Sequence, residues 1–149
     1  MPSSWTQNIY HAVFSTKHRI SAITPEIEMR LHPFIVGILK ELRCIPIAIN
    51  GTDDHLHFLT IYPSDLSHAD MLRHVKKRSS EWLHSEFADL RSFAWQEGYG
   101  GFTVSKSGMD DVAEYIRNQK SHHGKFDSLV EFKELLRRHE IDYDPKYLE

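Results

Sequence analysis

The segment over residues 55–62 constrains the fold more than any other stretch of this sequence. It reads His-Leu-His-Phe-Leu-Thr-Ile-Tyr and follows a polar turn over residues 50–54. Successive side chains of a strand face opposite sides of a sheet, so His55 and His57 share one face while Leu56 lies on the other. The pattern predicts a β-strand with a packed apolar face. Two neighbouring imidazoles on the opposite face form half of a metal site, which other parts of the chain have to complete.

Strand and helix patterns follow one another in a recognisable order. Apolar alternation predicts strands at 6–15, 45–49, 55–62 and 102–105. Helical spacing and capping residues predict helices that begin near residues 25, 67, 107 and 128, the last two ending near 121 and 139. The order β-α-β-β-α-β is that of the ferredoxin-like, RRM-like split β-α-β fold, an antiparallel sheet with two helices on one face. We therefore predict an α+β protein with additional C-terminal helices, in which the first and third strands are central neighbours.

Length and composition limit the classes of protein to which the chain can belong. Its 149 residues, without repeat, low-complexity tract or linker, predict a single domain over residues 1–149. An apolar run of about 18 residues, as a membrane span needs, does not occur, and the first residues lack the pattern of a secretory signal. The lone cysteine, Cys44, excludes an intramolecular disulfide and fits a reducing compartment. We expect a cytoplasmic protein with no membrane partner.

The helix expected near residues 107–121 offers candidates for the rest of the site. Tyr115 and Gln119 lie four positions apart, which places them side by side on one helical face. Val112 and Ile116 occupy the adjacent face and can anchor the helix by packing. The helix can therefore present a phenol, which can act as a nucleophile, next to an amide oxygen, which can bind a cation.

Two imidazoles and one amide oxygen leave open positions on a divalent cation, and phosphoryl transfer needs such openings. A bound metal polarises a phosphate oxygen and neutralises charge in the transition state. A tyrosine hydroxyl, with an ordinary pKa of about 10, needs that help to attack. The product would be a phosphotyrosine ester, which stores the bond for rejoining without ATP. The residues thus indicate His55, His57 and Gln119 as metal ligands and Tyr115 as the nucleophile.

With these motifs in this order, the sequence resembles the single-tyrosine HUH transposases of bacterial insertion sequences, including their repeat-associated relatives. The matching features are the triplet His55-Leu56-His57, the helix over 115–119 followed by His122-His123, the opening strand and loop over 13–19, and the tract over 95–102. The resemblance spans roughly residues 5 to 148, which is nearly the whole chain.

The resemblance implies more than the residues themselves indicate. It implies a metal-dependent tyrosine DNA transposase, which is a single-strand endonuclease and strand transferase. Such an enzyme cleaves and rejoins single-stranded DNA at hairpin ends through a 5′-phosphotyrosine, here on Tyr115. The resemblance assigns His55, His57 and Gln119 to Mg²⁺ or Mn²⁺. It also implies a homodimer in which the tyrosine helix can complete the partner's active site instead of its own.

Six basic residues are the candidates for contacts with DNA phosphates. Two follow the first strand and four lie near the start of the second helix: Lys17, Arg19, Arg73, Lys76, Lys77 and Arg78. Basic side chains on a helix are by default a solvated face. The formal net charge of -3 argues against a sequence-wide basic coat but is compatible with a local basic groove.

Other interpretations of the same residues stay open. Two histidines in a strand are more often incidental than metal-binding, and Tyr115 by default is a half-buried helix aromatic. On the same fold, the chain could be a non-catalytic binder of structured single-stranded nucleic acid. Zinc is the competing metal and would indicate a hydrolase, with His122 or Asp54 as a third ligand. The last helix is by default core or dimer packing.

Overall fold

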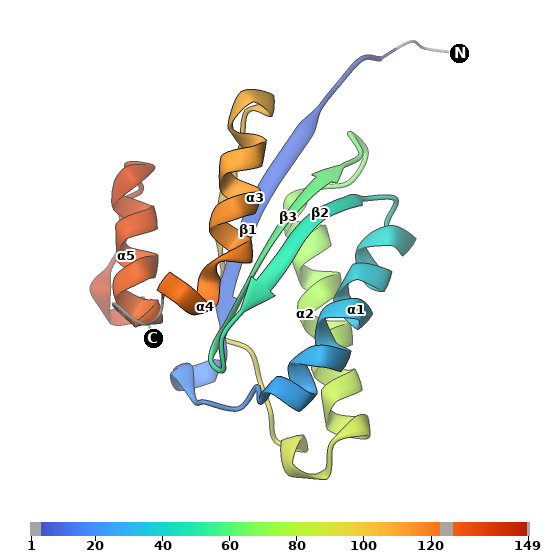
Figure 1. Cartoon of the computed structure of the whole chain (residues 1–149), viewed down its shortest axis with the longest axis vertical. Helices are drawn as coiled ribbons and strands as arrows, with labels where there is room; N and C mark the ends of the chain where they lie inside the picture. The colour runs from blue at the N-terminus through green and yellow to red at the C-terminus, as the bar shows by residue number, and fades with distance from the viewer. Residues whose placement is uncertain (1–3, 123–126, 149) are drawn as a thin grey trace.

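One antiparallel sheet of four strands organises the structure (Figure 1). The computed structural model describes residues 4–122 and 127–148, with the side chain of His122 excepted. The strands are β1 (Asn8–Ser15), β2 (Ile45–Gly51), β3 (His55–Tyr62) and β4 (Gly100–Thr103), and they lie side by side in the order β2-β3-β1-β4. The first and third strands are therefore the central pair, as the split β-α-β interpretation predicts.

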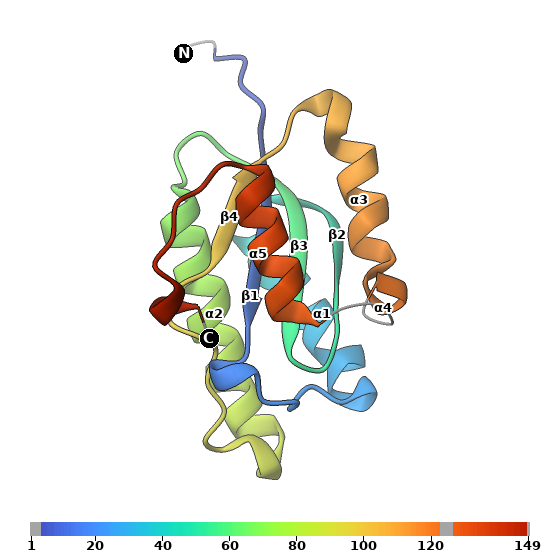
Figure 2. The same cartoon turned by 90° about the vertical axis from the view of Figure 1, so that its left-hand side faces the viewer.

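Helices cover both faces of this sheet. Those in the described residues are α1 (Pro25–Glu41), α2 (His68–Glu86), α3 (Met109–Arg117), α4 (Gln119–His122) and α5 (Ser128–Arg138). The helices α1 and α2 lie on one side, whereas α3 and α5 lie on the other (Figure 1, Figure 2). Short 3₁₀ turns occur at Lys17–Arg19, Ala88–Leu90, Lys106–Gly108 and Pro145–Tyr147. The predicted α+β class is confirmed, and the additional C-terminal helices cover the second face.

No helix in these described parts of the chain combines the length and the apolar character that crossing a bilayer requires.

Successive side chains of β3 point to opposite faces of the sheet and so belong to two different packed layers. Leu56 and Phe58 belong to the larger apolar core, which lies under α1 and α2. Leu59 lies on the opposite face and packs with apolar residues of α3. His55 and His57 share that second face, where their relative exposures are 1% and 0%. The face that carries the histidines is therefore the predicted one, and it is covered by protein.

Capping residues determine where most of the helices begin. The hydroxyl of Thr24 accepts a hydrogen bond from the backbone N–H of Ile27 at 3.3 Å, and Ser67 caps α2 in the same way. Both caps were expected from the sequence. Asp127 caps α5 by accepting from the N–H of Val130 at 2.9 Å. This cap places Glu131 in the first turn of α5, where the helix dipole favours a carboxylate.

The third helix differs from its expected boundaries. Ser107 does not cap it; instead the Ser105 hydroxyl accepts the N–H of Gly108 at 3.1 Å and caps the 3₁₀ turn that precedes α3, whose own N-cap residue is Gly108. The helix then ends at Arg117 and not near residue 121. Asn118 leaves the helical conformation, with φ -96° and ψ 18°, and α4 begins directly after it. Asparagine interrupts helices readily because its side chain competes for backbone hydrogen bonds.

Gly101 provides a test of how closely the sheet packs. It lies on β4 opposite Ala12 of β1, and a Cβ at this position would overlap the hydroxyl and ring of Tyr10. Because Tyr10 is itself buried, we expect Gly101→Ala to lower the free energy of unfolding by about 1–3 kcal/mol in urea unfolding. Gly37→Ala in α1 is the matched control, because nothing lies within 4 Å of the added methyl group. Equal effects of the two substitutions would contradict this packing.

Candidate active site

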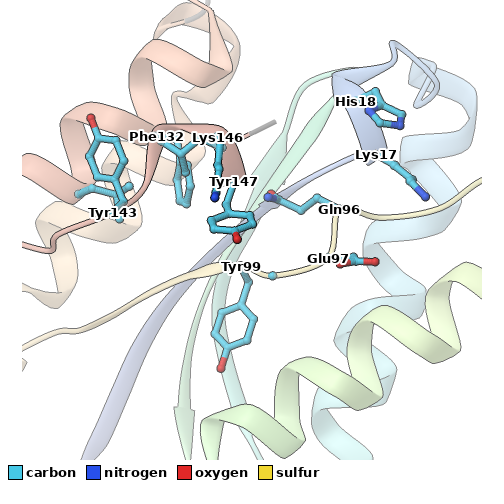
Figure 3. A pocket seen from close by; sticks show the side chains of 12 residues that line it. Lys17, His18, Gln96, Glu97, Tyr99, Phe132, Tyr143, Lys146 and Tyr147 are labelled. Atoms are coloured by element: carbon cyan, nitrogen blue, oxygen red, sulfur yellow. The ribbon is translucent and has the colours of Figure 1, made fainter.

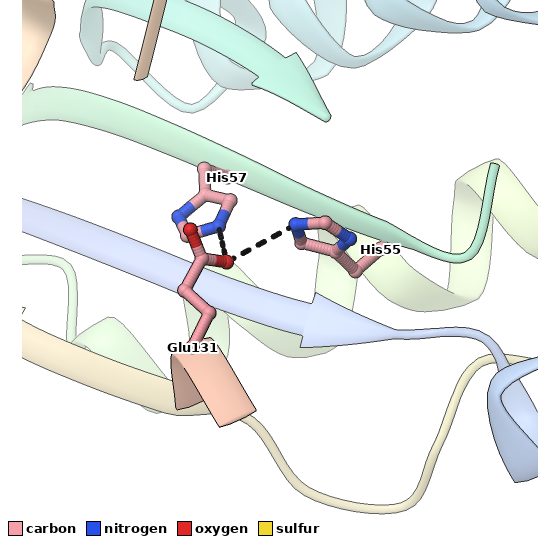
Figure 4. A group of neighbouring side chains, drawn as sticks. All are labelled: His55, His57 and Glu131. Carbon is pink, nitrogen blue, oxygen red and sulfur yellow. Dashed lines mark hydrogen bonds and ion pairs between the residues drawn. The ribbon is translucent and has the colours of Figure 1, made fainter. Parts of the chain in front are cut away.

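The two histidines of β3 point at one buried carboxylate (Figure 4). Oε1 of Glu131 lies 2.9 Å from Nε2 of His57 and 3.2 Å from Nε2 of His55. Glu131 is 2% exposed, so all three side chains are shielded from water. One ligand atom from each residue lies within 4.8 Å of the others, which makes the group a possible metal site.

Tyr115 and Gln119 reach the same carboxylate from α3 and α4. The hydroxyl of Tyr115 donates a hydrogen bond to Oε2 of Glu131. The amide nitrogen of Gln119 donates to the same oxygen at 3.0 Å, and its amide oxygen lies 3.0 Å from Nε2 of His55. A single chain therefore brings together all four residues that the sequence analysis singled out for chemistry: His55, His57, Tyr115 and Gln119.

Further side chains hold the outer nitrogen of each imidazole. Nδ1 of His55 lies 3.0 Å from Oδ1 of Asp54 and 2.8 Å from the hydroxyl of Thr52. Nδ1 of His57 lies 2.8 Å from Nε2 of His11, a buried histidine of β1. When Nδ1 carries the proton and donates it outward, the lone pair of Nε2 faces the cluster. The surrounding residues thus orient both rings for binding at Nε2.

Burial and pairing shift the acid–base behaviour of the cluster. Burial would raise the pKa of Glu131, but hydrogen bonds from His55 and His57 outweigh it and hold that pKa far below its usual range. Burial lowers the pKa of His55, but hydrogen bonds to Asp54 and Glu131 raise it to about 9. Burial, together with the bond to Glu131, raises the pKa of Tyr115 well above its usual value. The phenol is therefore neutral and has to lose its proton before it can act as a strong nucleophile.

The donor set fits a divalent cation. It combines two imidazole nitrogens, one carboxylate oxygen and one amide oxygen, all of which bind divalent metals. Neighbouring ligand atoms on an octahedral ion with bonds of about 2.1 Å lie about 3 Å apart. The separations found here between Nε2 of each histidine and its oxygen neighbours run from 2.9 to 3.2 Å. The residues that fit such an ion are His55, His57, Gln119 and Glu131.

Glu131 and His11 were not among the candidates that the sequence suggested. Glu131 precedes Phe132 and lies four positions before Leu135, so it continues an apolar stripe of α5. A carboxylate in such a stripe has to find a partner once it is buried, and this is the signal that could have identified it. The last helix therefore contributes to the cluster as well as to packing.

The sequence suggested Asp54 or His122 as a third ligand for zinc. Asp54 contacts the outer nitrogen of His55 and does not face the cluster. The side chain of His122 and the whole of His123 lie outside the described residues.

Two of the six basic candidates for DNA contacts lie on the same side of the molecule as α5. Lys17 and Arg19 belong to the 3₁₀ turn after β1. A guanidinium N–H of Arg19 donates to the hydroxyl of Ser128 at 2.7 Å and so links this turn to the start of α5.

The other four lie on α2, on the opposite side of the sheet from α3, the helix that carries Tyr115 (Figure 2). The ammonium of Lys76 donates to the carbonyl oxygens of Gln96 and Gly98 at 2.6 and 2.7 Å, which gives it a structural partner. Arg73 and Arg78 form surface ion pairs with acidic neighbours, and Lys77 is exposed. The structure therefore does not gather the six residues around one site, and their role in DNA binding stays a prediction.

Comparison with known proteins now decides the family. The family described as "Transposase IS200 like" matches residues 4–119, which is more than half of the chain. The chain belongs to this IS200-like transposase family. The transposase for insertion sequence element IS200 from Salmonella typhimurium strain LT2 is 28% identical over 116 residues, covering 74% of this chain and 75% of that protein. The IS200 transposase of Salmonella typhi matches to the same extent.

Two solved structures share the fold. A putative transposase from Deinococcus radiodurans R1 superposes with a TM-score of 0.67 at 22% identity, covering 80% of this chain and 95% of that one. A REP-associated tyrosine transposase bound to a REP hairpin superposes with a TM-score of 0.64 at 15% identity, covering 85% of this chain and 74% of that one. The family match ends at residue 119, so α5 and Glu131 lie beyond the residues that define membership.

The contact between His11 and His57 predicts a measurable effect on metal binding. His11→Phe keeps an aromatic ring but removes the nitrogen that lies 2.8 Å from the outer nitrogen of His57. We expect Mn²⁺ to bind about 10–100-fold more weakly, as measured by titration with electron paramagnetic resonance detection of free Mn²⁺. His11→Gln, which offers an acceptor oxygen, should recover most of the affinity. Unchanged affinity in the Phe variant would show that His11 does not orient His57.

Proposed function

We propose that this chain is a metal-dependent DNA transposase that cleaves single-stranded DNA at hairpin ends and rejoins it through a 5′-phosphotyrosine on Tyr115. The observation that carries the proposal is that the phenol of Tyr115 and Nε2 of both histidines converge on one carboxylate, that of Glu131. A nucleophile next to a cation site is the arrangement that phosphoryl transfer requires. Membership of the IS200-like family supports transposition, and the hairpin-bound relative of similar fold supports a hairpin substrate.

Cleavage would proceed by in-line attack of Tyr115. Its hydroxyl oxygen forms a bond to phosphorus, and the bond between phosphorus and the 3′ oxygen of the preceding nucleotide breaks. The 5′ phosphate stays on Tyr115, and the departing oxygen takes up a proton to become a free 3′-hydroxyl. Oε2 of Glu131 is the acceptor closest to the phenolic proton, because it already accepts that hydrogen bond. Attack of a 3′-hydroxyl on the phosphotyrosine reverses these steps and rejoins the strand.

The proposed cation is Mg²⁺ or Mn²⁺, held by His55, His57, Gln119 and Glu131. When bound, such an ion polarises a phosphate oxygen and offsets negative charge in the transition state. The two oxygen ligands favour Mg²⁺ or Mn²⁺. Zinc also suits two histidines with one carboxylate, so Glu131 is the specific observation that favours a zinc-dependent hydrolase as the second candidate.

We further propose that Tyr115 acts on the cation site of its own chain. The ring centroids of Tyr115 and His57 are 5.9 Å apart within one chain, and Gln119 contacts His55 in the same chain. The homodimer that the family resemblance implies stays part of the proposal. Its partner subunit would not be needed to supply a ligand or the nucleophile.

The phosphotyrosine predicts a covalent protein–DNA adduct. Wild-type protein incubated with single-stranded hairpin DNA and Mn²⁺ or Mg²⁺ should form a band that survives denaturing electrophoresis. Tyr115→Phe retains the ring but has no nucleophilic oxygen, so the adduct should fall at least about 100-fold. An undiminished adduct in this variant would assign the nucleophile to another residue.

Chelator and metal exchange separate the competing functions in the same assay. The transposase requires Mn²⁺ or Mg²⁺ and loses the adduct in chelator. A non-catalytic binder would bind the hairpin equally with and without chelator and form no adduct. A zinc hydrolase would release cleaved DNA with zinc bound and leave no covalent intermediate on Tyr115.

Action within one chain can be tested by mixing two defective variants. Tyr115→Phe lacks the nucleophile, and His57→Ala lacks a cation ligand. If each tyrosine serves its own site, a co-expressed mixture should form no more adduct than either variant alone. Adduct on the His57→Ala chain, identified by a size tag, would instead show that the tyrosine completes the site of a partner. Circular dichroism of each variant establishes that both are folded.

A further inference from the structure

A hollow of about 540 Å³ is lined by residues outside the cluster (Figure 3). Its walls come from the turn after β1, the loop before β4, α5 and the C-terminal segment. The volume falls within the range of about 300–1,000 Å³ that is usual for pockets that take small ligands. Its lining is mainly aromatic and basic, with one acid: Lys17, His18, Glu97, Tyr99, Phe132, Tyr143, Lys146 and Tyr147 are among its residues.

Two links connect this hollow to the cluster. One is covalent and the other runs through hydrogen bonds. Phe132 lines the hollow and follows Glu131 directly on α5. Gln96 also lines it, and its amide oxygen accepts from the backbone N–H of Ser15 at 2.7 Å and from the Ser15 hydroxyl at 3.0 Å. Ser15 is the partner of His55 in the pairing of β1 with β3. The hollow and the cluster thus adjoin at the same end of the central strands.

The walls of the hollow are fixed by interactions within the fold. The ammonium of Lys76 binds the carbonyl oxygens of Gln96 and Gly98, which holds the loop before β4 in place. The turn that carries Lys17 contains two residues with left-handed backbone, His18 at φ 58° and Arg19 at φ 54°. Such conformations persist only where the surrounding structure enforces them, and they concentrate at functional sites.

Two of the aromatic side chains at this hollow are exposed, whereas Phe132 is buried. Tyr147 is 74% exposed and Tyr143 is 42% exposed. In Figure 3, Tyr147 lies between Phe132 on one side and Lys17 and His18 on the other. Proteins that bind single-stranded nucleic acid combine exposed aromatic rings, on which bases stack, with cations that follow the phosphates. The composition of the hollow matches that combination.

The ammonium of Lys146 lies 5.0 Å from the centroid of the Tyr147 ring and covers one face of it. We propose that this hollow holds an unpaired base of the single strand next to the attacked phosphodiester, with the other face of Tyr147 as its stacking platform and Lys17 facing the adjacent phosphates. The proposal rests on the proposed function and adds a subsite to it. It also gives a role to the C-terminal segment, which lies beyond the residues matched by the family. The recognised group is the flat face of a base, so the subsite tolerates different sequences.

Binding of a single strand with and without bases tests the subsite. The probes are a ten-residue oligothymidylate and the same chain with abasic residues, measured by fluorescence anisotropy in chelator so that no cleavage occurs. Tyr147→Ala should weaken binding of oligothymidylate about 10-fold and leave binding of the abasic chain unchanged. Tyr147→Trp, which retains a stacking surface, should bind oligothymidylate at least as well as wild type. Trp5→Ala is the matched control, because Trp5 is 90% exposed and does not line the hollow.

The ammonium of Lys17 should act on phosphates and not on bases. Lys17→Gln should weaken both probes equally and reduce the slope of log affinity against log salt by about 1. Equal losses for Tyr147→Ala and Trp5→Ala, or a loss for Tyr147→Ala that is the same with the abasic chain, would overturn the stacking role.

The adduct assay distinguishes failure of the base subsite from failure of the proposed function. If the subsite positions the strand, Tyr147→Ala should raise the DNA concentration for half-maximal adduct formation about 10-fold without changing the maximal rate. A Tyr115-dependent adduct with unchanged concentration dependence would refute the subsite and leave the transposase intact. Base-dependent binding through Tyr147 without any adduct would refute the transposase and leave a nucleic-acid binder.

Discussion

The contacts of the Glu131 carboxylate are the interaction on which the rest of the site depends. A charge that is 2% exposed has to be paired, and this one contacts side chains from β3, α3 and α4. Because Glu131 belongs to α5, the same contacts fasten the C-terminal helix to the sheet. Leaving a buried charge without its partner costs about 3–5 kcal/mol. The cluster around Glu131 and the packing of α5 are therefore one energetic unit.

The negative charge of the Glu131 carboxylate also opposes the approach of a DNA phosphate. A phosphate that reaches Tyr115 comes close to the negative charge of Glu131, in a chain whose formal net charge is already -3. Burial, reinforced by His57, lowers the pKa of His11 well below its usual value, so His11 adds no positive charge. A cation bound at the cluster, the protonated imidazole of His55 and the guanidinium of Arg19, which interacts with Glu131, can supply the counter-charge. On the proposed function, the metal thus neutralises its own ligands as well as the substrate.

Periodicity predicted those parts of the structure that depend on neighbours in sequence. Period two placed His55 and His57 on one face of the central strand, and the order of elements gave the strand arrangement. Glu131 was not predicted because only tertiary packing brings α5 over the sheet (Figure 2). His11 was not predicted because its contact with His57 is diagonal across the two strands. The residue directly opposite His57 is Val13, which lies two positions after His11. Alternation gives the face of a side chain but not the register between two strands.

The position of α5 depends on a residue with no polar contact to the site. A Cβ on Gly100 would overlap the ring of Phe132, so glycine at this point of β4 allows α5 to approach the sheet. Phe132 packs in that gap and lines the hollow, while Glu131, its neighbour in the helix, reaches His57. The packing of Phe132 against Gly100 and binding in the hollow that Phe132 lines therefore act on the same turn of helix as the carboxylate. Any change that displaces Phe132 should alter both the proposed base subsite and the proposed cation site, although these two sites share no residue.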